Sequence, residues 1–202
     1  MRKARVLTPV ILASTLLALG VQSVPAGAAT PTFFGAKLTS HSQPSNAQFG
    51  PYTCDESAHI PSGANCTWVS TQAYKNGGHE QAPTTGTIKH VKLVSCVAGS
   101  FTLQLAQANP STRTARVVSN GPVVKYISTD CSNDVYVVQS YAVNLHVVKG
   151  EYIAIKAKGT GAISCSGGSG VLLYAPPLAP GGPTKTAPSG ASCNLLVQLS
   201  YV

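Results

Sequence analysis

The side chains that can carry out catalysis are few and widely spaced in this sequence. Its 202 residues include 6 Asp and Glu residues and 5 histidines. Asp55 and Glu56 are adjacent, so in an extended loop they point apart and do not form the facing carboxylate pair of glycosidases. The glycine-rich residues 166–170 lack the strand-turn-helix context of a hydrolase nucleophile. We therefore expect no catalytic residues and no enzyme activity, with a secreted hydrolase as the alternative.

Two loop clusters bear on that alternative and on metal binding. His59 lies within residues 54–66 beside two acids and Ser57, which together would supply a His–acid–Ser arrangement. Asp130 and Asp134 are close in sequence and would supply two carboxylates to a calcium site. Solvated acids in turn-forming loops are the more ordinary interpretation of both clusters. We therefore expect no metal and no cofactor.

Residues suited to ligand binding are easier to find. Sugar rings dock on exposed aromatic faces, while amide and hydroxyl groups bind the sugar OH groups. A glycine turn at residues 76–78 brings such residues close together in the sequence. The ligand-binding residues that we predict are Trp68, Gln72, Tyr74, Asn76 and His79. For Trp68, which is the single tryptophan, a place in the core of a β-sandwich is the alternative.

All six cysteines are expected to form disulfide bonds. They follow a predicted signal peptide, and their spacing contains neither a C-x₂-C element nor a close Cys/His pair, so we expect no zinc site. Sequence alone leaves many pairings open, and we predict that neighbours pair: Cys54–Cys66, Cys96–Cys131 and Cys165–Cys193. A rigid loop spanned by the first bridge would suit a protease inhibitor, which is a further functional alternative.

Residues 1–28 have the order of parts found in a secretory signal peptide. Three basic residues precede an apolar run at residues 10–21, and the small residues 26–28 follow. The apolar run is too short to span a bilayer. We therefore expect cleavage to leave residues 29–202 as one extracellular domain, secreted by a bacterium.

Charge and hydropathy narrow the range of partners. Removing residues 1–28 takes away 3 of the 14 basic residues, which leaves 11 against 6 acidic ones. The closest grouping is Lys149, Lys156 and Lys158, and the other basic residues are scattered singly. A nucleic-acid site needs a clustered basic stripe, so nucleic acid is not an expected partner. No second apolar run reaches membrane-spanning length, so we expect no membrane insertion after cleavage.

Period-2 alternation of apolar and polar residues predicts an all-β fold. The clearest runs, residues 141–148 and 152–158, flank a Lys-Gly-Glu turn, and we interpret them as a central antiparallel hairpin. Residues 87–97 and 100–106 are interpreted as a second hairpin. The chain as a whole contains about ten predicted strands, which favours an antiparallel β-sandwich with jelly-roll wiring.

Turn residues and histidines complete this outline. Residues 114–119 and 123–128 are interpreted as two short strands separated by an Asn-Gly-Pro turn. Residues 175–191 hold five prolines and three glycines and are interpreted as a long surface loop. His90 and His146 lie in predicted strands, where a position on the sheet surface is more usual than a ligand role.

One hairpin motif resembles a known class of protein. The pattern small-x-Leu-x-Val-x-x-Gly-Asp/Glu-x-Ile-x-Ile is found in secreted jelly-roll modules of actinobacterial type. The matching positions are Asn144, Leu145, Val147, Gly150, Glu151, Ile153 and Ile155. The resemblance extends over residues 87–157 and implies a β-sandwich. It carries over no catalytic residue, and relatives with this architecture include carbohydrate-binding and adhesion modules.

These observations favour a secreted, non-catalytic module for binding or surface interaction. The expected partner is a glycan, the cell wall or another protein. Three structural outcomes distinguish the alternatives. A hydrolase requires carboxylates or a His–Ser pair converging in a pocket, an inhibitor requires a rigid exposed loop, and a binding module requires exposed aromatic residues on a rim or flat sheet.

Overall fold

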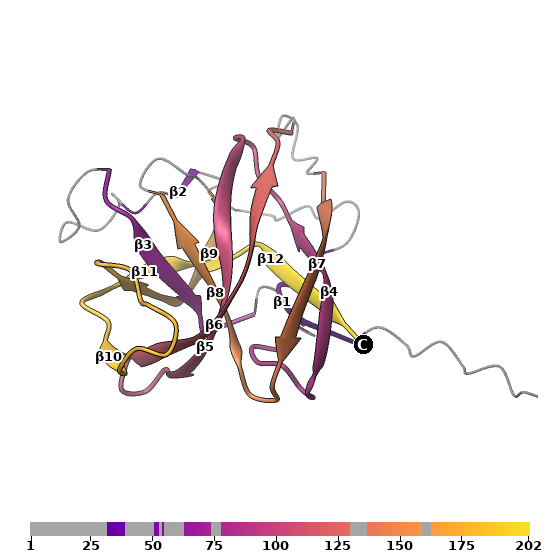
Figure 1. Ribbon diagram of the computed structural model, residues 1–202. Helices are drawn as coiled ribbons and strands as arrows, with labels where there is room; N and C mark the ends of the chain where they lie inside the picture. The colour runs from indigo at the N-terminus through magenta and orange to yellow at the C-terminus, as the bar shows by residue number, and fades with distance from the viewer. Residues whose placement is uncertain are drawn as a thin grey trace, which may run out of the picture.

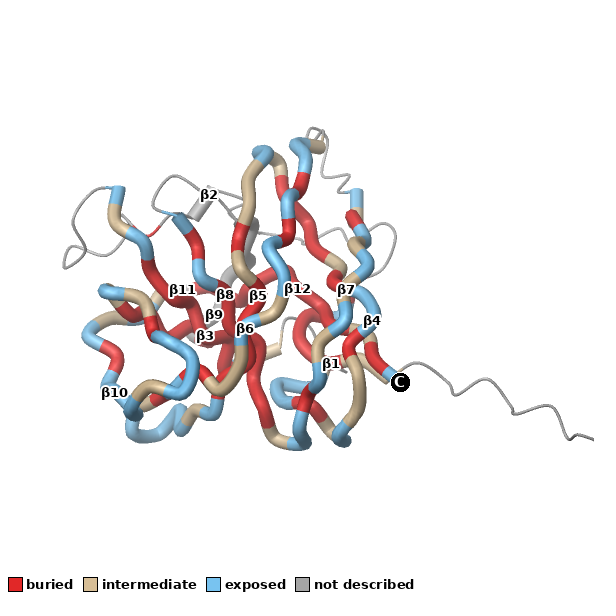
Figure 2. Tube along the Cα trace, viewed as in Figure 1, coloured by how far each residue is buried: buried red, intermediate tan, exposed pale blue. Residues whose placement is uncertain are grey.

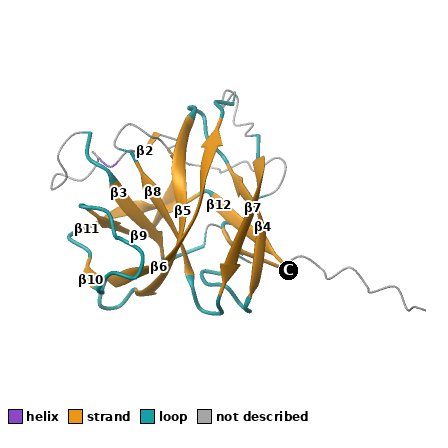
Figure 3. Ribbon diagram, in the orientation of Figure 1, coloured by secondary structure: helices purple, strands orange, loops and turns teal. Residues whose placement is uncertain are grey.

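The computed structural model describes residues 32–38, 51–52, 54, 63–73, 78–129, 137–158 and 163–202. These residues form strands joined by loops, and none of them is in an α-helix (Figure 3). The described part therefore has no helix able to cross a membrane. The predicted signal peptide lies outside the described residues, as do the acids and histidine of the two loop clusters.

Twelve antiparallel strands form two sheets, which pack face to face (Figure 1). The small sheet has the order β1 (Thr32–Gly35), β12 (Val197–Tyr201), β4 (Gly86–Leu93) and β7 (Gln139–Val147). The large sheet has the order β10 (Lys185–Thr186), β6 (Thr114–Tyr126), β5 (Gly99–Asn109), β8 (Tyr152–Ala157), β3 (Cys66–Ser70), β9 (Ile163–Tyr174) and β11 (Ser189–Leu195). The short β2 (Pro51–Tyr52) pairs with β9.

Eight of these strands have the wiring of a jelly roll. The order β1-β12-β4-β7 in the small sheet faces the order β3-β8-β5-β6 in the large sheet. When these eight strands are followed along the chain, each lies in the other sheet from the one before it, except that β6 follows β5 within the large sheet. This is the double Greek-key path of the jelly roll. The strands β9 and β11 extend the large sheet beyond β3. The predicted all-β, antiparallel, jelly-roll-like sandwich is therefore confirmed, with twelve strands where about ten were expected.

The main core lies between the inner faces of the two sheets. Leu103 and Ile155 enter it from the large sheet, and Ile88 and Leu199 enter it from the small sheet. All four are fully buried, and Figure 2 shows the buried stretches converging at the centre of the molecule. Burying a side chain of this size contributes about 1.5–3 kcal/mol, so alternating apolar positions drive the two sheets together.

The predicted central hairpin is wrong, although both of its strands exist. β7 pairs with β4 in the small sheet, whereas β8 pairs with β5 and β3 in the large sheet. The turn at residues 148–151 therefore crosses from one sheet to the other. Gly150 has a φ of 88°, and the Glu151 carboxylate accepts a hydrogen bond from the Val148 N–H at 2.9 Å. A turn signal marks a change of direction, but it does not specify which strand the chain pairs with next.

The second predicted hairpin is wrong for the same reason. Residues 87–97 and 100–106 contain β4 and β5, which belong to different sheets. β5 forms its hairpin with β6, and β6 is one strand of 13 residues rather than two short ones. The Asn-Gly-Pro sequence lies inside β6, close to a register shift with β5. A Cβ at Gly121 would lie 2.9 Å from Leu145 Cδ2 of the opposite sheet, so a larger residue there would require the Leu145 side chain to move.

The proline-rich segment is also more ordered than predicted. Residues 175–188, here called the strap, lie over the outer face of the large sheet (Figure 1, around β10). Leu178 of the strap is 3% exposed and belongs to a second apolar cluster with Val69, Ala154 and Tyr174. β10 pairs with β6 at the edge of the sheet. The strap therefore gives the large sheet a core on both faces.

A buried polar network fixes the strap to three strands. The Thr67 hydroxyl donates to Gln104 Oε1 at 3.1 Å and accepts from the Leu178 N–H at 3.1 Å. The Gln104 amide donates to Asn120 Oδ1 at 2.8 Å and to the Leu178 carbonyl at 3.4 Å. Both side chains are fully buried, so these partners satisfy polar groups that would otherwise destabilise the fold.

The predicted Cys54–Cys66 disulfide is confirmed. The two Cα atoms are 5.8 Å apart, and both residues are fully buried. Cys96 and Cys193 are also disulfide-bonded. Their predicted partners are Cys131, which lies outside the described residues, and Cys165, whose side chain is not described, so these two pairings stay predictions. Disulfide bonding is compatible with an oxidising, extracellular compartment.

Candidate functional site

The structure does not assemble the predicted ligand site as a unit. Trp68 is 2% exposed, and its indole N–H donates to Cys66 Sγ at 2.8 Å inside the main core. Its predicted role in stacking on a sugar is therefore wrong, and the alternative of a core tryptophan is right. Tyr74 and Asn76 lie outside the described residues. Gln72 and His79 are exposed, and each lines a hollow in the surface.

Most described tyrosines are in the interior as well. Tyr126, Tyr152, Tyr174 and Tyr201 are each less than 5% exposed, and Tyr141 is half-buried. Their rings fill the cores, so they present no open face on which a sugar ring can stack. The polar side chains of the described surface are therefore the candidate binding groups.

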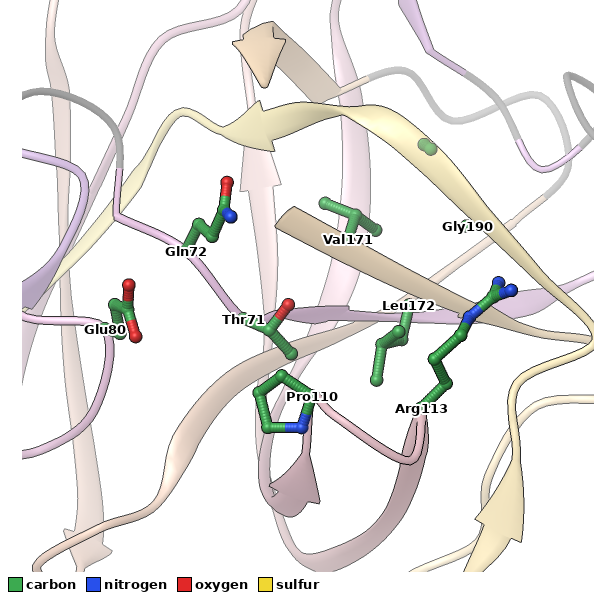
Figure 4. Close-up of a pocket in the computed structure, with 9 residues that line it drawn as sticks. Thr71, Gln72, Glu80, Pro110, Arg113, Val171, Leu172 and Gly190 are labelled. Atoms are coloured by element: carbon green, nitrogen blue, oxygen red, sulfur yellow. The ribbon is translucent and has the colours of Figure 1, made fainter. Parts of the chain in front are cut away.

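A pocket of about 490 Å³ collects such side chains from five separate segments of the chain (Figure 4). We call it the Glu80–Arg113 pocket. Its lining consists of Thr71, Gln72, Glu80, Pro110, Arg113, Val171, Leu172, Gly190 and Ala191. A second hollow of about 430 Å³ shares Glu80 and is also lined by His79 and Lys149. The two hollows bring Gln72 and His79 into one polar region.

Gly170 positions the Thr71 and Gln72 side of the pocket. Its carbonyl accepts hydrogen bonds from the Thr71 N–H at 2.6 Å and from the Thr71 hydroxyl at 3.1 Å. A Cβ at residue 170 would collide with the Gln72 side chain and would lie 2.5 Å from Asn194 Oδ1. Only glycine allows Gln72 to lie across β9 in this way. Gln72 thus lines the pocket beside Thr71 (Figure 4).

Arg113 occupies the opposite side and has a strained backbone. It closes the β5–β6 hairpin, where its N–H bonds to the Pro110 carbonyl at 3.2 Å, and its φ is 55°. The left-handed conformation is unusual for arginine, and it persists only where the surrounding structure holds it. The Arg113 carbonyl accepts from the Tyr174 hydroxyl at 3.3 Å and from the Ala187 N–H at 2.8 Å. The strap and β9 therefore fix the residue that carries the guanidinium.

Gly190 and the buried Tyr174 are the neighbours that shape the surroundings of Arg113. A Cβ at Gly190 would lie 3.4 Å from Arg113 Nη2 and 2.9 Å from the Val171 carbonyl, so glycine leaves the guanidinium room beside β11. Burial raises the pKa of Tyr174 to about 12, an effect that the positive charge of Arg113 partly opposes. Tyr174 therefore stays protonated at neutral pH and keeps donating to the Arg113 carbonyl.

Glu80 is carried by a segment that is tied to both sheets. The Gly35 N–H donates to the His79 carbonyl at 2.7 Å, and the Ala82 N–H donates to the Glu151 carbonyl at 2.9 Å. The His79 ring lies 6.4 Å from the Phe33 ring of β1. These contacts hold the Glu80 carboxylate on one side of the pocket, across from Arg113 (Figure 4).

The arrangement can bind a polar molecule at several points. Arginine offers a planar fork of N–H donors that matches a carboxylate, and a carboxylate such as Glu80 accepts hydrogen bonds from hydroxyl groups. Pro110 and Leu172 lie between the two charges and supply apolar contact (Figure 4). Glu80 is the single carboxylate among the nine lining residues, so the lining does not contain the carboxylate pair of a glycosidase.

The strand histidines take the sheet-surface positions that were the more usual expectation. β4 and β7 are neighbours, with His90 opposite Ala142 and His146 opposite Thr87. Both histidines are exposed, and the register does not place them opposite each other. Within the described ranges, no three His, Cys, Asp or Glu side chains come close enough to hold a metal ion.

The sequence did not point to Thr71, Glu80 or Arg113. Thr71 and Glu80 border the predicted glycine turn, so their nearness to Gln72 and His79 was a usable signal. Arg113 comes from the β5–β6 hairpin, which was not among the predicted hairpins. No local motif marks it, because its position depends on strap contacts with residues 174 and 187.

Comparison with protein-family models, with curated proteins and with solved structures finds no match to this chain. The resemblance to secreted actinobacterial jelly-roll modules therefore stays a prediction. The structure supports its coarser content, an all-β fold of antiparallel sheets.

Proposed function

We propose that this chain is a non-catalytic extracellular binding module that holds a polar carbohydrate in the Glu80–Arg113 pocket. The observation that carries this proposal is that one pocket is lined by a guanidinium, a carboxylate and an amide, with apolar Pro110 and Leu172 between the two charges. Carbohydrates need this combination, because they present many hydroxyl groups together with apolar C–H faces. The predicted signal peptide and the disulfide bonding support an extracellular setting.

The charges of the pocket narrow the ligand further. Arg113 lies on one side and favours an anionic group, most simply the carboxylate of an acidic sugar. Glu80 and Gln72 lie on the other side and favour hydroxyl groups. A glycan that contains a uronic or similar acidic residue satisfies both sides. A neutral glycan has no anionic group to pair with the Arg113 guanidinium, which would stay hydrated. We therefore expect a neutral glycan to bind more weakly.

A glycan array followed by titration calorimetry tests this proposal. Arg113→Asn removes the guanidinium and keeps a residue type that tolerates positive φ, so it separates binding from backbone strain. We expect it to weaken binding of an acidic glycan at least about tenfold, which corresponds to about 1.4 kcal/mol. Arg116→Asn is the matched control, because Arg116 is exposed on β6 and bonds only to Gln107 among the described contacts.

The alternatives give different results in the same experiment. An array without any bound glycan would contradict the proposal, as would equal losses in the two arginine variants. Release of shortened glycans during incubation would indicate a hydrolase. Inhibition of a protease that is lost when residues 55–62 are cut would indicate the inhibitor alternative, whose loop lies outside the described residues.

A further inference from the structure

The strap covers only part of the outer face of the large sheet. The cross-strand register places Val123, Thr102, Lys156 and Thr67 in one row, on four neighbouring strands. Thr67 is buried beneath the strap by its bond to Leu178, but Lys156 and Val123 are exposed. In this row the cover of the strap therefore ends at β3, and the face is open from β8 to β6, whereas Ala154 and Gln104 further along the same strands are buried.

The next row continues the open surface. Ser100 of β5 lies opposite Lys125 of β6, and Lys158 follows β8 directly. Ser100, Thr102, Lys156 and Lys158 line one shallow hollow of about 220 Å³. We call Ser100, Thr102, Lys125, Lys156 and Lys158 the lysine face. The closest lysines of the sequence, Lys156 and Lys158, are thus joined by a third one, Lys125, from β6.

The geometry of the sheet sets the spacing of the three charges. The Cα atoms of residues i and i+2 in a strand are about 6.6 Å apart, and this is the expected backbone distance between Lys156 and Lys158. Neighbouring strands are about 4.8 Å apart, which puts Lys125 about 9.6 Å from Lys158 across β5. The hydroxyls of Ser100 and Thr102 lie on the strand between the lysines. The result is a flat array of donors rather than an enclosed site for one small ion.

Acidic residues do not neutralise this array within the described part of the chain. The described acids are Glu80, which lines the pocket at the opposite end of β3, and Glu151, which is buried in its own turn. Neither borders the lysine face. Three ammonium groups on one face, with no carboxylate beside them among the described residues, repel one another, and a polyanion relieves that repulsion.

We propose that the lysine face binds a linear polyanion, with repeating anionic groups engaging Lys125, Lys156 and Lys158 in turn. A flat face with charges several ångströms apart suits an extended polymer, and lysine serves as a point charge for phosphate, sulfate or carboxylate. A lipid surface is a poorer fit, because among the described residues only two exposed large apolar side chains, Val123 and Ile127, flank Lys125 in the sequence. This site is separate from the Glu80–Arg113 pocket and does not depend on the carbohydrate proposal.

The test uses two labelled polymers, a polyphosphate and heparin, with the complete chain. Their anionic groups differ, so the two arms distinguish a phosphate polymer from a sulfated or carboxylated polysaccharide. We expect fluorescence anisotropy to show binding that weakens with salt. The variant K125Q/K156Q/K158Q should lose at least about tenfold in affinity, and the slope of log Kd against log salt should fall by about one per lysine.

The matched control is K37Q/K89Q/K92Q, which removes the same charge from the side of the molecule that carries the small sheet. We expect less than about twofold change in affinity for this control. Equal losses in both variants would show that net charge alone is responsible and would overturn the proposal. Binding confined to anionic vesicles, or no polymer binding at about 50 mM salt, would also overturn it. Arg113→Asn should leave polymer binding unchanged, which keeps this result independent of the pocket.

Discussion

The outer face of the large sheet has two halves that differ in what covers them. Under the strap, β8 presents Tyr152 and Ala154, which are 4% and 0% exposed. Two residues further along the same face, Lys156 is exposed. β5 shows the same change, from the buried Gln104 to the half-exposed Thr102. One continuous pair of strands therefore carries an interior at one end and a solvated surface at the other.

This difference shows what the strap contributes to the fold. Backbone pairing is the same in both halves, so pairing does not decide which side chains are tolerated. The presence or absence of the strap decides which side chains are tolerated, because a side chain enclosed between the strap and the sheet must be apolar or have hydrogen-bond partners. Where the strap ends, the same face can carry lysines and offer them to a partner.

The largest expected effect comes from moving the residue type of the open half into the covered half. Ala154→Lys would place an unpaired ammonium under the strap or displace the strap, and we expect it to lower the free energy of unfolding by at least about 3 kcal/mol. Lys156→Ala on the same face should change it by less than about 0.5 kcal/mol. Urea denaturation of both variants measures the contrast. Similar stabilities would mean that the strap does not enclose Ala154.

The polar network gives a smaller and more local contrast. Gln104→Ala removes the side chain that joins Thr67, Asn120 and Leu178, and leaves buried polar groups unsatisfied. We expect a loss of about 2 kcal/mol in urea denaturation, together with faster trypsin cleavage after Lys185 of the strap. The control is Gln107→Ala, three residues along β5 but exposed, with an expected change below about 0.5 kcal/mol. Unchanged cleavage at Lys185 would dissociate the network from the strap.

The smallest effect concerns the two buried tyrosines at high pH. Burial raises the pKa of Tyr174, under the strap, and of Tyr126, in the main core, to about 12, against about 10 in the unfolded chain. The stability that these two tyrosines give to the folded state is therefore fully present below pH 10 and is lost as the pH rises towards 12. Tyr174→Phe removes one of the two groups and should make the urea midpoint fall less steeply between pH 9 and pH 11. At pH 7 it should cost about 1 kcal/mol or less, for one lost hydrogen bond. A pH slope identical to that of the natural chain would contradict burial of the Tyr174 hydroxyl.

Local sequence predicted the faces of the strands but not their partners. Alternation at residues 152–158 separates Ile153 and Ile155 from Tyr152 and Ala154, and in the structure Ile153 and Ile155 lie in the main core. It could not show that β8 lies beside β5 rather than β7, because alternation gives the direction of side chains and contains no information on pairing. For the same reason, Tyr152 and Ala154 were placed on the outer face but their burial could not be foreseen. That burial comes from the strap, whose proline content indicated an open loop.

The candidate site was predictable only in part. Gln72 and His79 were predicted because they border a glycine turn, and each lines a hollow, but Trp68 was assigned to the surface site although it belongs to the core. Arg113 could not be found without the fold. Its place depends on a β5–β6 register, a left-handed backbone and strap contacts, and these connect segments far apart in the sequence. The lysine face has the same origin, since Lys125 joins Lys156 and Lys158 through pairing with β5.

The position of β12 has a consequence for synthesis. Residues 197–201 form the strand between β1 and β4, so a ribosome that has reached residue 190 has made both neighbours without the strand that joins them. Until then, β1 and β4 each expose an unpaired edge, and such edges invite association with other chains. The polypeptide therefore completes its smaller layer only after residues 197–201 have been added, and loss of those residues would leave that layer divided.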